Sequence, residues 1–243
     1  LEFRRVLFRS HQGGNDVTLI DQWPAHIEAI RKNGLIADFN GEEVVANLPI
    51  FSPEEIDHQN EQVDLIIALT KAQQLDAMFK AIQPMITEKT YVLCLLNGLG
   101  HEDVLEKYVP KENILVGITM WTAGLEGPGR VKLLGDGEIE LENIDPSGKE
   151  FALEVVDVFQ QAGLNPSYSS NVRYSIWRKA CVNGTLNGLC TILDCNIAEF
   201  GALSVSESLV KTLISEFAAV AEKEAIHLDQ AEVYTHIAQT YDP

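Results

Sequence analysis

The sequence is short of basic residues. It has 18 Lys and Arg against 36 Asp and Glu, which gives a formal net charge of −18 at pH 7. Nucleic acids and anionic membrane surfaces attract proteins that carry an excess of Lys and Arg. Long apolar runs are also missing, and none approaches the roughly 18 to 20 residues that a membrane-spanning helix needs. We therefore expect neither nucleic acid nor a membrane as a partner.

Cysteines and histidines are few. Three of the four cysteines lie in or beside one apolar segment, and no C-x-x-C pair is present among Cys94, Cys181, Cys190 and Cys195. This usage predicts buried free thiols in a reducing compartment, which we take to be the cytoplasm. The six histidines show no metal-ligand spacing, so we expect no bound metal.

The first ten residues, LEFRRVLFRS, do not read like the rest of the chain. They contain no initiator Met, and their charges interrupt the apolar residues too often for a secretory signal. We interpret residues 1–10 as a non-native segment, a cloning or assembly scar, and leave it out of the fold prediction.

Apolar runs typical of strands then alternate with helical patterns as far as Ser170. Asn40-Gly41 predicts a tight hairpin, and a second hairpin is expected to join 130–134 with 138–142 at a sheet edge. The remaining strands are expected at 16–21, 63–69, 91–96, 114–123 and 165–169, and helices at 25–33, 72–86, 101–108 and 149–162. From Tyr174 onward only helical patterns remain.

This order predicts an α/β fold, with a doubly wound parallel sheet over residues 11–170 and an all-helical domain over residues 171–243. Such sheets bind ligands outside the carboxyl ends of their strands. Asp21 ends one of the expected strands, and Lys71 and Asn97 follow two others. In the helical domain, one face of the segment 206–224 should be buried, with 209, 213, 217 and 220 as its apolar positions.

The segment from Ile176 to Leu193 is apolar yet carries three polar residues at steps of four, Lys179, Asn183 and Asn187. On a helix these side chains form one stripe, and Ala180, Gly184 and Gly188 form a stripe of small residues beside it. A lysine is rarely buried without a partner, so this stripe predicts a ligand site. The alternative is that Lys179 extends to solvent and both asparagines bond neighbouring helices.

Three motifs resemble the ketopantoate reductase (2-dehydropantoate 2-reductase) family: LTKAQQ around Lys71, LLNGLG around Asn97 and WRKACVNGTLNG around Lys179. The resemblance runs from about Gln12 to the end of the chain. It implies a Rossmann-type dinucleotide-binding domain followed by a helical domain for substrate binding and dimerisation, with a homodimer as the expected assembly. It also implies an NADPH-dependent oxidoreductase that reduces ketopantoate, a small 2-oxo acid, to pantoate in pantothenate (vitamin B5) biosynthesis.

The same resemblance implies roles for single residues. Lys179 would be the catalytic lysine that polarises the keto oxygen, and Asn183 and Asn187 would bind the substrate. Asn97 would hold the cofactor and orient the substrate, and Lys71 would lie near the nicotinamide ribose. Asn97 could instead be a simple turn residue, and Lys71 an exposed residue that opens a helix.

The sequence departs from the family at both ends. The family's first strand and its G-x-G-x-x-G turn are replaced by residues 1–10, and the family's C-terminal Ser and Glu lie beyond Pro243. We therefore expect a chain that is truncated at both ends and is itself inactive.

A third departure concerns the cofactor. Asp21-Gln22 stand where the family usually has an Arg that faces the 2′-phosphate of NADPH. A carboxylate at this point typically binds the ribose hydroxyls of NAD. The family thus implies NADP(H), whereas Asp21 favours NAD(H). An alternative function is that of a related NAD-dependent D-2-hydroxyacid dehydrogenase acting on branched or aromatic 2-oxo acids. A non-enzymatic alternative is a nucleotide-binding structural module.

Overall fold

The computed structural model describes residues 4–39, 41–58, 62–120, 122–134 and 137–241. The chain divides into two compact units. The first comprises Leu1–Leu96 and Gly100–Ser170, and the second comprises Asn97–Leu99 and Asn171–Pro243. The first unit contains the sheets and the second is helical, so the predicted fold class is confirmed.

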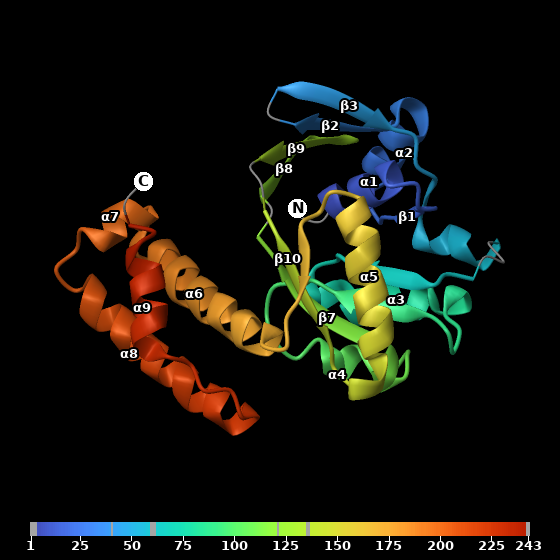
Figure 1. Cartoon of the computed structure of the whole chain (residues 1–243). Helices are drawn as coiled ribbons and strands as arrows, with labels where there is room; N and C mark the ends of the chain where they lie inside the picture. The colour runs from blue at the N-terminus through green and yellow to red at the C-terminus, as the bar shows by residue number, and fades with distance from the viewer. Residues whose placement is uncertain (1–3, 40, 59–61, 121, 135–136, 242–243) are drawn as a thin grey trace. The chain divides into compact units, whose positions relative to one another are not determined.

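The largest sheet has five strands in the order β11-β10-β7-β6-β5. Its strands are β5 (Leu65–Ala68), β6 (Tyr91–Cys94), β7 (Ile114–Thr119), β10 (Ile139–Asn143) and β11 (Pro166–Tyr168). Figure 1 labels β10 and β7 of this sheet. β5, β6 and β7 are parallel, whereas β10 is antiparallel to β7. The apolar runs form strands here because both faces are covered, as the full burial of Leu93 and Leu115 shows. Helix α5 (Lys149–Gln161) packs its buried Val155 and Phe159 into this core.

Two smaller sheets complete the strands of the first unit. β1 (Leu19–Ile20) pairs in parallel with β4 (Ile50–Phe51). The other sheet has the order β3-β2-β9-β8, with β2 (Leu35–Phe39), β3 (Glu42–Ala46), β8 (Thr122–Gly127) and β9 (Arg130–Leu134). The predicted hairpin at Asn40-Gly41 is confirmed by the pairing of Phe39 with Glu42.

The second predicted hairpin is wrong. β9 pairs with β2 and β8, whereas β10 pairs with β7 and β11. Gly129, at φ 74°, allows the turn between β8 and β9, so β9 folds back on the strand before it. Ile139 and Leu141 are fully buried in the core of the large sheet, which draws β10 away from β9.

Short helices connect the strands of the first unit. They are α2 (Pro24–Asn33), α3 (Leu75–Ala81) and α4 (Glu102–Leu105), with 3-10 turns at Pro53–His58, Ala72–Gln74, Gln83–Met85, Lys111–Asn113 and Pro146–Gly148. The helix expected over 72–86 is therefore divided into three pieces. Pro84 accounts for the last break, because a proline in a helix interior removes a hydrogen bond.

The segment that we left out of the fold prediction forms a helix, α1 (Arg4–Gln12). Val6 is fully buried against the core of the large sheet, and Leu7 packs against the core of the smaller sheets. Beyond the helix, a Cβ at Gly13 would lie 3.1 Å from Cα of Ala162, so the chain passes close to the end of α5. The segment Arg4–Gln12 thus contributes to the core of the large sheet and to the core of the smaller sheets.

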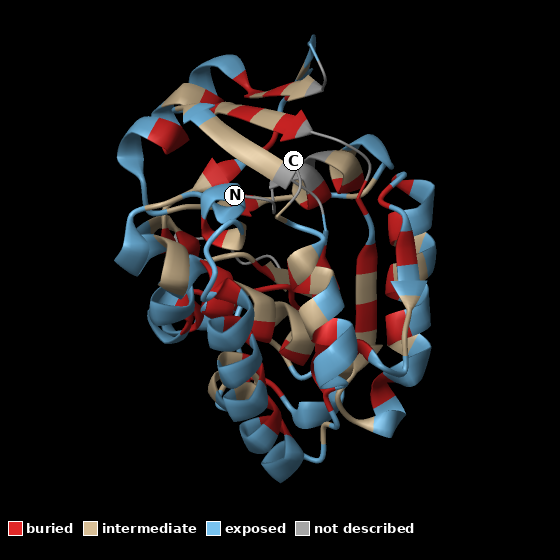
Figure 2. Ribbon diagram, turned by 90° about the vertical axis from the view of Figure 1, so that its left-hand side faces the viewer, coloured by how far each residue is buried: buried red, intermediate tan, exposed pale blue. Residues whose placement is uncertain are grey.

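The helical unit contains α6 (Val172–Leu193), α7 (Ile197–Gly201), α8 (Ser206–Ala221) and α9 (Gln230–Ala238), with a 3-10 turn at Glu222–Glu224. Its core includes Cys181, Leu186, Phe200, Ile214 and Ile237. Figure 2 shows buried positions along one side of the helices and along the strands.

The buried face of α8 differs from the predicted one. Val210, Ile214, Ala218 and Ala221 are buried, whereas Leu209 is 37% exposed and Val220 is 58% exposed. Each of these buried residues comes directly after one of the apolar residues predicted to be buried. The helix therefore has two adjacent apolar stripes with the same helical period. Periodicity alone could not choose between them.

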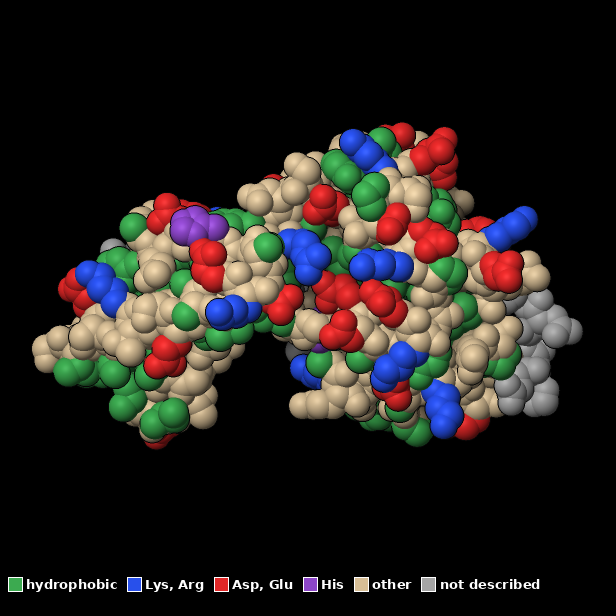
Figure 3. Space-filling model, turned by 90° about the horizontal axis from the view of Figure 1, so that it is seen from below, with side chains coloured by type: hydrophobic (Ala, Val, Ile, Leu, Met, Phe, Trp, Pro, Cys, Tyr) green, Lys and Arg blue, Asp and Glu red, His purple; other side chains and the backbone are tan. Residues whose placement is uncertain are grey.

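The surface carries both acidic and basic side chains. On the face shown in Figure 3, acidic and basic side chains are interspersed. Lys107 lies 3.2 Å from Asp76 and Lys211 lies 2.6 Å from Glu207, both as exposed ion pairs. Such pairs contribute little to stability, about 0–1 kcal/mol each. In each of these pairs, a basic side chain lies next to one of the more numerous acidic side chains.

Candidate active site

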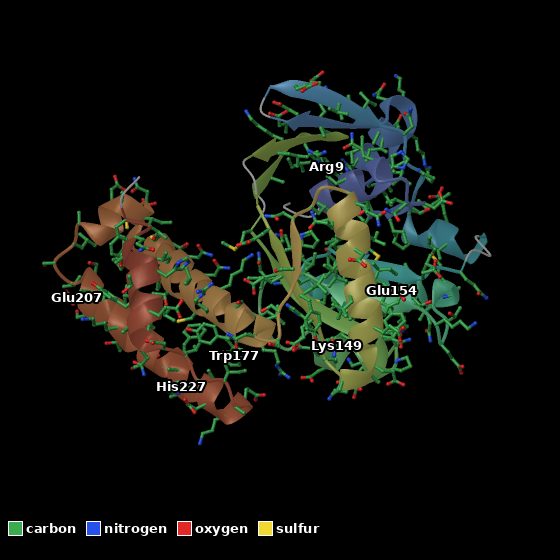
Figure 4. The ribbon with its side chains drawn as sticks, in the orientation of Figure 1. Arg9, Lys149, Glu154, Trp177, Glu207 and His227 are labelled. Atoms are coloured by element: carbon green, nitrogen blue, oxygen red, sulfur yellow. The ribbon has the colours of Figure 1, made fainter. Side chains whose placement is uncertain are left out.

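The polar stripe on α6 lies off the buried face of that helix. Trp177 and Cys181 are buried, and Trp177 packs with Ala218 and Leu228 on the side of α8 (Figure 4). Lys179 and Asn183 are half-buried and Asn187 is exposed. One helix thus carries a lysine and two amides at successive turns, and Asn187 is the most exposed of the three.

Of the two glycines beside this stripe, Gly184 and Gly188, only Gly188 has room for a side chain. A Cβ at Gly184 would lie 2.7 Å from Cζ of Phe217, so this position serves the close packing of α6 on α8. A Cβ at Gly188 would meet nothing within 4 Å. The small residue at Gly184 therefore lets another helix approach α6 closely, whereas the space beside Gly188 is open.

A three-residue cluster fixes α6 against α9. Arg178 Nη1 lies 2.6 Å from Glu232 Oε1, the Tyr174 hydroxyl donates to Glu232 Oε2, and Arg178 lies 6.0 Å from the centre of the Tyr174 ring. The hydrogen bond from Tyr174, with the Arg178 contact, holds the pKa of Glu232 below its usual value. Burial, with the Glu232 contact, raises the pKa of Tyr174 to about 12.

Sequence reasoning missed this cluster. The only local pattern in the sequence is the spacing of Tyr174 and Arg178 by about one helical turn. Their partner Glu232 lies 58 and 54 residues further along the chain. Lys179 follows Arg178 in the sequence, so its side chain leaves the helix about 100° further round, on a different face.

The carboxyl end of β5 carries Thr70 and Lys71. Lys71 is exposed at the start of the 3-10 turn, and its carbonyl accepts a hydrogen bond from the Gln74 amide at 2.8 Å. The hydroxyl oxygen of Thr70 is buried and has no hydrogen-bond partner among the described residues. Buried polar atoms are almost always bonded, so this hydroxyl fits a polar ligand such as a dinucleotide at the edge of the sheet.

Asn97 follows β6 and is exposed. Gly98 at φ 111° and Gly100 at φ 75° give the turn after it the left-handed backbone that glycine tolerates. Ala68 pairs with Cys94 in the sheet, so Lys71 and Asn97 each come three residues after a paired position. The segment Asn97–Leu99 belongs to the helical unit, as do Lys179, Asn183 and Asn187, whereas Asp21 and Lys71 belong to the first unit.

Asp21 follows β1 and is half-buried. Its Oδ1 accepts a hydrogen bond from the Trp23 amide at 2.9 Å, and its own amide donates to Phe51 O at 3.1 Å. Asp21 therefore also shapes the turn into α2, a local role typical of aspartate. Arg31 lies on α2 but binds Ile50 O at 2.9 Å and Glu55 at 2.6 Å, which commits its charge elsewhere.

Comparison with known proteins decides the family. The sequence profile of "Ketopantoate reductase PanE/ApbA" matches residues 6–146, and that of "Ketopantoate reductase PanE/ApbA C terminal" matches residues 171–242. The chain belongs to the ketopantoate reductase family. This membership makes it an oxidoreductase with the fold described above.

Individual members of the family are closely similar to the chain. The 2-dehydropantoate 2-reductase of Lactococcus lactis is 54% identical over 233 residues, which cover 96% of this chain and 74% of the relative. A crystal structure of a candidate 2-dehydropantoate 2-reductase from Enterococcus faecalis is 95% identical, with a TM-score of 0.82, over 99% of this chain and 77% of that one. D-mandelate dehydrogenase with NADH and anilino(oxo)acetate is 52% identical, with a TM-score of 0.93 and the same coverage.

The chain thus spans about three quarters of the length of these relatives. Among its described residues, no group of three or more His, Cys, Asp and Glu side chains could hold a metal ion. In the same part of the chain, no helix is long and apolar enough to cross a membrane.

Proposed function

We propose that the protein reduces the 2-oxo group of ketopantoate, as a 2-dehydropantoate 2-reductase. The observation that carries this proposal is the match of both units to one family, with the half-buried Lys179 in the matching helix. Residues 11–170 bind the dinucleotide in this proposal, and residues 171–243 bind the substrate.

Lys179 acts on the keto oxygen of the substrate. As negative charge develops on that oxygen, a positioned ammonium group stabilises it and can supply the proton. Asn183 and Asn187 donate amide hydrogen bonds to the carboxylate and hydroxyl end of the substrate. The cofactor supplies the hydride when it is bound. Asp21, Thr70, Lys71 and Asn97 are the residues that would hold it.

We propose NADH as the preferred cofactor. Asp21 offers a carboxylate to the ribose hydroxyls, and Arg31 is bound to Glu55 and therefore does not neutralise a 2′-phosphate. The D-mandelate dehydrogenase structures, at 52% and 51% identity, contain NADH. The measurement that tests this proposal is the Kd for NADH and for NADPH, and tighter binding of NADPH would contradict it.

A second function deserves a direct test. Similarity to D-mandelate dehydrogenase favours a D-2-hydroxyacid dehydrogenase that acts on aromatic or branched 2-oxo acids. We would compare kcat/KM for ketopantoate with that for the 2-oxo acid corresponding to mandelate, using both cofactors. Preference for ketopantoate supports the first function and the reverse order supports the second. In a form extended to the full length of the relatives, cofactor binding without turnover of either acid would support a nucleotide-binding structural module.

The assembly and the compartment of the protein are also proposals. In the helical unit, the apolar side chains of Ile192, Val205 and Val220 are 80%, 51% and 58% exposed. We propose that a second copy covers part of this surface, and sedimentation of the protein at several concentrations would test it. The four free cysteines are consistent with the reducing cytoplasm as the compartment.

A further inference from the structure

The C-terminal end of α6 brings two cysteines together. Asp194 ends the helix in the left-handed conformation, at φ 51° and ψ 50°. The Cys195 amide then donates a hydrogen bond to Cys190 O at 3.1 Å. This pattern is the Schellman motif, in which the side chains at the positions of Cys190 and Cys195 commonly contact each other.

The two cysteines also differ from the others in exposure. Cys94 and Cys181 are buried, at 3% and 0% exposed, whereas Cys190 and Cys195 are half-buried at the border of the helical core. The prediction of four buried thiols is therefore wrong for this pair. Their position at the helix end explains the difference, because the last turn of α6 extends beyond the core, as the 80% exposure of Ile192 shows.

The pKa shifts of the cysteines also indicate that Cys190 and Cys195 lie close together. Burial raises the pKa of Cys94 to about 12 and that of Cys181 to about 11. The pKa of Cys190 is also raised, first by burial and then by the charge of Cys195 and a hydrogen bond to its thiol. Each of the two sulfurs is therefore the other's neighbour, at a place that solvent can reach.

We propose that Cys190 and Cys195 are a redox modification site, which forms a reversible intrachain disulfide across the end of α6. With a peroxide as oxidant, one thiol becomes a sulfenic acid and one water leaves. The second thiol attacks that sulfur, so that the S–S bond forms, the S–O bond breaks and a second water leaves. The two thiols lose two electrons and two protons, and the peroxide is reduced to two waters. A dithiol reverses the step by thiol–disulfide exchange.

Proteolysis on the N-terminal side of aspartate residues offers a direct test. Cleavage before Asp194 separates Cys190 from Cys195, while Cys181 and Cys190 stay on one peptide because no aspartate lies between them. The protein would be treated with hydrogen peroxide, its remaining thiols alkylated, and the digest analysed by mass spectrometry with and without reduction. We expect the two peptides to remain joined until they are reduced.

Matched variants identify the sulfurs. Cys190→Ser and Cys195→Ser should each abolish the joined peptides, whereas Cys181→Ala should leave them joined. If either serine variant fails to fold by circular dichroism, the Cys181→Ala protein and the unmodified protein still decide the question. Joined peptides in both support the proposal. Separate peptides after peroxide treatment, or a link lost in Cys181→Ala, would overturn it.

Discussion

Two adjacent cations on α6 have different surroundings. Arg178 is bound to Glu232 on α9, and Lys179, about 100° further round the helix, faces a different direction. A guanidinium suits a fixed ion pair, whereas the mobile ammonium of lysine suits proton transfer. Lysine is thus the residue type suited to the role that we propose for Lys179.

In a form of the protein extended to the full length of its relatives, replacing Lys179 with alanine should reduce kcat/KM by about 10²–10⁴-fold, the usual range for a positioned proton donor. Thermal stability should hardly change, because the lysine lies on the half-buried stripe and outside the core. Arg173→Ala is the matched control, since Arg173 is an exposed cation on the same helix. Turnover close to that of the unmodified protein would favour the alternative in which Lys179 merely extends to solvent.

Asp21→Asn is the sharpest test of cofactor choice. Asparagine keeps an Oδ1 acceptor for the Trp23 amide and removes only the charge. Two unit charges about 4 Å apart repel by roughly 4 kcal/mol at an effective dielectric of 20, before screening by salt. We expect the ratio of Kd for NADPH to Kd for NADH to fall by about tenfold or more. An unchanged ratio would show that Asp21 does not face the 2′ position.

At the scale of helices and strands, local chemistry was readable from the sequence and long-range pairing was not. The α6 stripe followed from a period of 3.6, and the hairpin at Asn40-Gly41 followed from turn chemistry. The partner of β9, the buried face of α8 and the Tyr174–Glu232 contact each depend on segments far away in the chain. The residues on α6 could thus be proposed from the sequence, and the contact between α6 and α9 could not.

The two glycines of α6 make a paired stability test. Gly188→Ala should stabilise the protein by about 0.5–1 kcal/mol, since alanine costs less entropy than glycine in a helix and no atom lies within 4 Å of the new Cβ. Gly184→Ala should gain less or lose stability, because its Cβ would lie 2.7 Å from Phe217. Thermal or urea unfolding would measure both. Equal gains would mean that α8 can move away from α6 without cost.

The cluster on α6 and α9 should make stability depend on pH in the acid range. The folded pKa of Glu232 is below the ordinary 4.5, so its contribution is present above about pH 4.5 and is lost as pH falls through the folded pKa. Glu232→Gln should therefore destabilise the protein at pH 7, by about 1 kcal/mol or less because the pair is partly exposed. The two proteins should differ less at pH 3. A difference that persists at pH 3 would mean that packing, and not charge, is responsible.

At the scale of the whole molecule, cofactor binding should protect one of the two units from amide hydrogen exchange more than the other. A ligand at 100 times its Kd stabilises the folded state by about 2.7 kcal/mol. We expect NADH to slow amide hydrogen exchange mainly in β5, β6 and the segments that follow them, which carry Lys71 and Asn97. Protection confined to α8 and α9 would contradict our assignment of the dinucleotide to the first unit.

The pairing of β2 with β9 has a consequence for synthesis of the chain. Ile36 is in register with Arg130, so the ribosome must add the 94 residues from 36 to 130 before this parallel pair can form. At about 5–20 residues per second, the wait lasts roughly 5–20 s. The β2–β3 hairpin can close early, but one edge of β2 stays open to other chains during that interval. The nascent protein is therefore most exposed to misassembly before β9 emerges, and slow translation between these strands would prolong the risk.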